Sequence, residues 1–135
     1  LEPSSAASDV YKRQYIYTTA SSPALAAGVK VSLDLIFNDK KLRENLKKNI
    51  DLFRSSIINT NLLSKSSTPI QPIIIGSPKK ALHISEQLMQ KGFYVPAIRP
   101  PTVPKGTSRL RVSLSSNHKK KDILNLSKLI NELTS

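Results

Sequence analysis

Residues 97–114, which read AIRPPTVPKGTSRLRVSL, combine a stiffened loop with a strand pattern and decide the fold. Three prolines in the first half each fix the backbone angle φ, so the loop has little conformational freedom. After the loop, apolar and polar residues alternate, which predicts a strand with one buried face. The two faces are Leu110, Val112 and Leu114 on one side and Arg109, Arg111 and Ser113 on the other.

Two helices are predicted well before this stretch. Helical periodicity of apolar residues covers Pro23–Phe37, and Ser22 followed by Pro23 is typical of a helix start. Asn38-Asp39 predicts a break. A second, clearly amphipathic helix follows, because apolar residues recur three or four positions apart at Leu42, Leu46, Ile50, Phe53 and Ile57.

A strand and a third helix are predicted next. Ile70–Gly76 predicts a short strand, and Pro72 places it at an edge or a bulge because proline has no N–H for the ladder. Ser77-Pro78 and Gly92 are typical of the start and the end of a helix. The predicted buried face of that helix consists of Ala81, Leu82, Ser85, Leu88 and Met89.

The order of the elements predicts the fold class. Phe93–Ile98 predicts a second strand, joined to the third by a hairpin-like connection over Arg99–Ser108. Helix, helix, strand, helix, strand, strand and a last helix indicate an α+β domain with a small antiparallel or mixed sheet. The apolar face of the last helix consists of Ile123, Leu126, Ile130 and Leu133.

The composition limits the function classes. The chain of 135 residues has 21 Lys and Arg against 9 Asp and Glu, a net charge of +12, and no cysteine. Its aliphatic runs, such as Ile73–Ile75, are far shorter than the roughly 20 apolar residues of a membrane span. The sequence therefore predicts a soluble, cytoplasmic protein without a disulfide framework. With only His83 and His118, which are interpreted as structural residues, a histidine-based metal site is not expected.

The basic excess raises the hypothesis of a nucleic-acid or polyanion-binding module, because clustered lysine and arginine neutralise phosphates. Aromatic residues that would stack on bases make up only 5% of the chain, and the lysines are dispersed. We therefore expect no nucleic-acid partner, although the module stays the alternative. A third interpretation is an interaction domain whose rigid loop docks a partner.

The arginines of the decisive stretch have two interpretations. Arg109 and Arg111 are predicted to project from one strand face, and Arg99 begins the stiff loop. They are either exposed residues around a rigid turn or a pre-organised site, since arginine forms bidentate hydrogen bonds with carboxylates.

Three segments together resemble a known family. Residues 97–114, the segment Tyr15–Ala20 with Pro23–Ala27 after it, and Ile70–Gly76 resemble the α-oxoamine synthases, in the branch of biotin biosynthesis. The resemblance implies a fold-type-I pyridoxal 5'-phosphate enzyme that is a homodimer. It implies condensation of L-alanine with a pimeloyl thioester, carried on CoA or a carrier protein, with release of CO2.

The same resemblance implies roles for particular residues. Arg111 is expected to hold the carboxylate of the amino acid, and Arg99 and Thr102 to contact substrate from the loop. Thr18 and Thr19 match the pair from which one hydroxyl reaches the cofactor phosphate of the neighbouring subunit.

The resemblance also implies a division of the chain. Residues 15–63 are expected to be the end of a large domain with its connecting helix, and residues 64–135 a C-terminal small domain. Residues 1–14 show no periodicity and, with Met89 as the only methionine, are interpreted as a non-native leader. The Schiff-base lysine of the family is expected upstream of Tyr15, so this polypeptide alone is predicted to be inactive.

Overall fold

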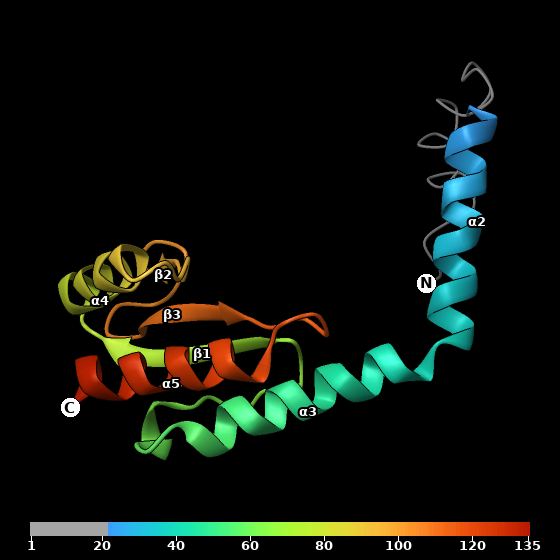
Figure 1. Cartoon of the computed structure of the whole chain (residues 1–135). Helices are drawn as coiled ribbons and strands as arrows, with labels where there is room; N and C mark the ends of the chain where they lie inside the picture. The colour runs from blue at the N-terminus through green and yellow to red at the C-terminus, as the bar shows by residue number, and fades with distance from the viewer. Residues whose placement is uncertain (1–21) are drawn as a thin grey trace, which may run out of the picture. The chain divides into compact units, whose positions relative to one another are not determined.

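The computed structural model describes residues 22–135, and Figure 1 labels their helices and strands. The chain divides into two compact units after Asp39. Of the first unit, the structure describes helix α2 (Pro23–Asn38). The second unit contains α3 (Lys40–Ser56), the 3-10 helix η1 (Thr60–Leu62), β1 (Ile70–Gly76), α4 (Pro78–Gln90), β2 (Ala97–Ile98), β3 (Ser108–Ser113) and α5 (Lys120–Thr134).

Helix α2 confirms the first predicted helix and the break after it. It begins with Pro23 in the first turn, where the missing N–H has no helical partner to lose, and it ends before the extended Asp39. None of its side chains is buried. The core residues therefore all belong to the second unit.

The sheet has three strands in the order β1-β3-β2, and both strand pairs are antiparallel. The decisive stretch thus supplies the central strand, β3, and one edge strand, β2. The other edge strand is β1, so Pro72 lies at an edge as predicted, where a missing N–H interrupts no second ladder. The fold class is α+β, and the sheet is antiparallel rather than mixed.

Helices pack on one face of this sheet. Ile73 of β1 and Leu110 and Val112 of β3 are buried in one cluster with residues of α3, α4 and α5. Among these are Phe53, Ile84 and Ile130. Helices α3 and α5 contact each other along this side (Figure 1). The burial of Leu110, Val112 and Leu114 confirms the alternation predicted from the sequence.

Strand β2 is shorter than predicted. The sequence indicated a strand over Phe93–Ile98, whereas only Ala97 and Ile98 pair with β3. The reason is Pro96, which lies opposite Arg111 in the continued register. Its carbonyl oxygen accepts the Arg111 N–H at 2.9 Å, but it has no N–H to return the second bond of the pair.

The buried face of α4 also differs in part from the prediction. Ala81 and Leu88 are buried as expected, but the third buried residue is Ile84, and Met89 is 51% exposed. Residues 81, 84 and 88 follow a spacing of three and four, which keeps them on one stripe. Met89 lies one position off this stripe and projects outward.

Candidate functional site

The face of the sheet opposite the helices carries the candidate site, and we call it the open face. It presents Arg109 and Arg111 from the central strand, and neither they nor their neighbours on this face are buried. Arg109 lies directly between Ile74 of β1 and Ile98 of β2, and Arg111 lies opposite Pro72. The Cβ atoms of directly opposite residues are only about 5 Å apart. Both arginines are therefore flanked by apolar side chains on the open face.

The loop between β2 and β3 is held by its own hydrogen bonds. The N–H of Thr102 donates to the carbonyl of Arg99 at 3.1 Å. The N–H and the hydroxyl of Thr107 both donate to the carbonyl of Pro104, at 3.2 and 2.8 Å. Nε of Arg109 then donates to the carbonyl of Thr107 at 3.0 Å, which ties the end of the loop to the open face.

The end of the loop also lies against the end of β1. Gly76 and Gly106 both have positive φ, at 81° and 79°, a backbone region that glycine enters without steric cost. A Cβ added at Gly76 would lie 3.4 Å from the carbonyl oxygen of Gly106. The two glycines therefore let the loop close onto the strand that flanks Arg109.

The predicted site residues fall into three groups. Arg111 is exposed on the open face, and Arg99 and Thr102 are exposed at the start of the loop, directly after Ile98. Arg111 therefore lies on the central strand β3, and Arg99 and Thr102 lie in the loop that joins β2 to β3. Thr18 and Thr19 lie outside the described residues.

Arg109 was not among the predicted binding residues, although the alternation already placed it beside Arg111. The bond from its Nε to the loop is the new observation, because it fixes the side chain in one orientation. No sequence pattern signalled that bond.

Within residues 22–135, no ion pair joins an acidic residue to the arginines of the open face. Between Asp51 and Asp122 the only acidic residue in the sequence is Glu86, which is exposed on α4. The ion pairs Lys30–Asp34 and Lys128–Glu132 lie in helices α2 and α5. Unpaired guanidinium groups on an apolar surface are suited to binding carboxylates.

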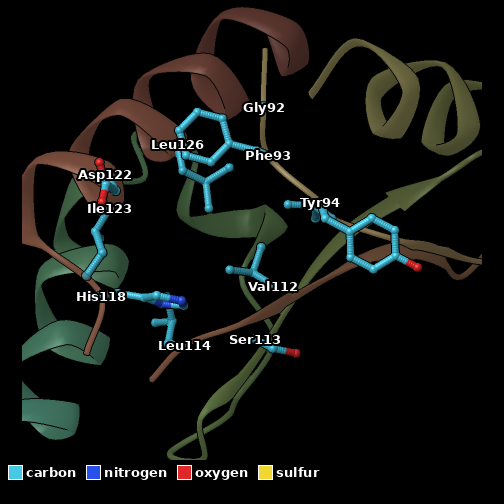
Figure 2. Close-up of a pocket in the computed structure, with 11 residues that line it drawn as sticks. Gly92, Phe93, Tyr94, Val112, Ser113, Leu114, His118, Asp122, Ile123 and Leu126 are labelled. Carbon is cyan, nitrogen blue, oxygen red and sulfur yellow. The ribbon is translucent and has the colours of Figure 1, made fainter. Parts of the chain in front are cut away.

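A hollow of about 450 Å³ lies on the other side of the sheet, between β3 and the start of α5 (Figure 2). Core side chains such as Val112 and Leu114 form part of its walls, and the exposed Ser113, His118 and Asp122 also line it. His118 has a structural role there, since its Nδ1 accepts the N–H of Ser115 at 3.2 Å. None of Arg99, Arg109 and Arg111 lines this hollow.

Within residues 22–135, no group of three or more histidine, cysteine or acidic residues is arranged to hold a metal ion. Nor does any helix there combine the length and the apolar character needed to cross a membrane.

The sequence comparisons define the class of protein. Residues 6–130 match the family of class I and class II aminotransferases, and the chain belongs to that family. Its fold is that of the C-terminal region of fold-type-I pyridoxal-phosphate enzymes.

Within this class, the similar curated proteins are 8-amino-7-oxononanoate synthases. The synthase of Saccharophagus degradans is 46% identical over 112 residues, which are 82% of this chain and 28% of that protein. The synthase of Dechloromonas aromatica is 45% identical over 122 residues, 90% of this chain and 32% of that protein. The chain thus spans about a third of the length of these relatives and matches their C-terminal region.

Solved structures agree with this assignment. The 8-amino-7-oxononanoate synthase of Francisella tularensis has a TM-score of 0.75 at 28% identity, covering 90% of this chain and 36% of the other. Serine palmitoyltransferase of Sphingomonas wittichii has a TM-score of 0.79 at 21% identity, covering 98% of this chain and 34% of the other, and supports the fold alone.

Proposed function

We propose that this chain is the substrate-binding C-terminal part of an 8-amino-7-oxononanoate synthase. The intact enzyme would condense L-alanine with a pimeloyl thioester, on CoA or a carrier protein, and release CO2 and the thiol. It would act as a cytoplasmic homodimer in biotin biosynthesis. The identity to the synthases supports the proposal, and the observation that carries it is Arg111, exposed and without an acidic partner on the open face.

Arg111 would bind the carboxylate of L-alanine. A guanidinium group offers two parallel N–H donors to a carboxylate, which fixes both the position and the orientation of that group. Because this carboxylate leaves as CO2 during the reaction, its orientation decides which bond can break. The short loop with Arg99 and Thr102 would close the substrate site from the adjacent edge of the sheet.

The described residues fit the substrate carboxylate and not the cofactor itself. No lysine lies on β1, β2 or β3, and Lys105 is exposed in the loop. Pyridoxal 5'-phosphate would supply the electron sink for the loss of CO2. We propose that a lysine upstream of Tyr15 holds it, and that Thr18 or Thr19 of the neighbouring subunit contacts its phosphate.

The proposal includes the division of the chain. Residues 15–63 would end the large domain and connect it to residues 64–135, the small domain.

The chain by itself is expected to be inactive. Incubated with pyridoxal 5'-phosphate, L-alanine and either pimeloyl-CoA or a pimeloyl carrier protein, it should form no 8-amino-7-oxononanoate by mass spectrometry. The longer enzyme that contains this chain should form it under the same conditions. Product formed by the chain alone would refute the expected position of the lysine, and a longer enzyme without product would refute the proposed function.

A polyanion-binding module is the second candidate, and the charge of the second unit favours it. From Lys40 onward the sequence has 18 basic and 5 acidic residues. Such a module would bind generic duplex DNA with a steep dependence on salt concentration. A shallow dependence in a titration between low and physiological salt would remove this candidate.

A further inference from the structure

We propose that Arg109 is a specificity-determining residue that binds the free terminal carboxylate of the acyl donor. The inference rests on the proposed function, in which Arg111 binds the other carboxylate, that of L-alanine. It adds a second carboxylate subsite on the same open face, at the end nearer the loop.

The orientation of Arg109 is the first argument. Its Nε donates to the carbonyl of Thr107 at 3.0 Å, and the hydroxyl of Thr107 is bonded to the carbonyl of Pro104. Because the hydrogen bond to the loop uses Nε, both Nη atoms of the guanidinium group remain available to donate to a ligand. In residues 22–135 the only side-chain bond of Arg109 is the one from Nε. A fixed fork with two donors is what bidentate carboxylate binding requires.

The surroundings of Arg109 are the second argument. Ile74 and Ile98 lie directly on either side of it, both half-buried, and Pro72 lies beside Arg111. Apolar residues thus lie beside both arginines, and this matches a ligand whose apolar chain carries a carboxylate at each end. A pimeloyl group joined to L-alanine is such a ligand.

The spacing is the third argument. Arg109 and Arg111 are two positions apart on one strand face, so their Cα atoms are about 7 Å apart. Two long side chains that start at this separation can reach the two ends of one extended ligand. The two like charges also favour a ligand that brings two negative charges rather than one.

The competing explanation is that Arg109 only braces the loop through Thr107. In that case, loss of Arg109 would also displace Arg99 and Thr102, and kcat/KM would fall by the same factor for every acyl donor. A subsite would instead affect only donors with a terminal carboxylate. The two explanations therefore predict different dependence on the donor.

The test compares pimeloyl-CoA with heptanoyl-CoA, which has a methyl group in place of the terminal carboxylate. In the longer holoenzyme, we expect kcat/KM to favour pimeloyl-CoA, and Arg109→Met to reduce that preference by roughly 10- to 100-fold. The KM for L-alanine should stay within about twofold. Arg109→Lys, which keeps the charge but not the fork, should reduce the preference by less.

Thr107→Val is the matched control, because it removes the hydroxyl bond of the loop and leaves the carbonyl that Arg109 contacts. It should preserve the preference for pimeloyl-CoA. If Arg109→Met keeps the preference, or slows both donors equally and raises the KM for L-alanine, the subsite is refuted while the proposed function stands. If the wild-type enzyme forms no product from either pimeloyl-CoA or a pimeloyl carrier protein, the proposed function itself is refuted.

Discussion

At the scale of single residues, Ser108 stands out at the start of β3. Its side chain is fully buried, and within residues 22–135 its hydroxyl has no hydrogen-bond partner. A buried hydroxyl without a partner costs about 1–3 kcal/mol of desolvation free energy. Ser85 on α4, which is half-buried, differs because its hydroxyl donates to the carbonyl of Val95 at 2.6 Å.

Ser108→Ala is therefore expected to stabilise the chain. The alanine removes the unsatisfied group and keeps the Cβ, so the free energy of unfolding should rise by about 1 kcal/mol. For a unit of this size, that is about 4–8 °C in Tm. Thermal unfolding followed by circular dichroism measures it.

Ser85→Ala is the control, since it breaks a bond that is present and should lower Tm. A Tm that falls with Ser108→Ala would show that its hydroxyl has a partner in solution.

At the scale of elements, a buried polar link joins α3 to β1. Gln71 is fully buried on the inward face of β1, and Nη1 of Arg54 donates to its Oε1 at 2.7 Å. The same Nη1 contacts the carbonyls of Ser64 and Ser66 at 3.2 and 3.4 Å. One guanidinium group thus donates both to the side-chain oxygen of Gln71 in β1 and to two backbone carbonyls of the connector before β1.

Arg54→Met should weaken this link. It would leave the carbonyl oxygen of Gln71 buried without its donor, and the free energy of unfolding should fall by about 1–3 kcal/mol. Urea unfolding of the chain measures the change. Lys48→Met, at an exposed position of the same helix, should change it by no more than about 0.5 kcal/mol. Equal effects of the two substitutions would contradict the role of Arg54.

The elements themselves were largely predictable from local patterns. The caps at Ser77 and Gly92 and the alternation in β3 depend on residues close together in sequence, so they could be read directly. The short length of β2 was not predicted, because Pro96 ends the pairing only when it lies opposite Arg111. The register that places it there is not specified by local sequence. The link from Arg54 to Gln71 joins residues 17 positions apart in different elements, and no periodic pattern signals it.

At the scale of the whole molecule, the charge is distributed unevenly. The segment from Lys40 onward has 13 more basic than acidic residues, whereas residues 1–39 have one more acidic than basic residue. Most of the lysines of the second unit are exposed, which is typical of solvated helix faces. Arg109 and Arg111 differ from these lysines, because both lie on one face of the sheet and Arg109 is hydrogen-bonded to the loop.

The candidate site was predictable in part. The alternation in β3 placed Arg111 on an outward face, and the prolines indicated a stiff loop at Arg99 and Thr102. That α3, α4 and α5 of the second unit all pack against the other side of the sheet depends on tertiary packing, which local patterns do not specify. The bond from Arg109 to Thr107 depends on side-chain geometry, which a single sequence does not specify.

Binding of the L-alanine carboxylate by Arg111 can be measured through the steady-state KM for L-alanine in the longer holoenzyme. Arg111→Ala should raise this KM about 10- to 100-fold, since a bidentate charge-assisted contact is lost. Ser113→Ala, at the next exposed position of the same strand face, should leave it within about twofold. An unchanged KM for L-alanine in Arg111→Ala would contradict the account.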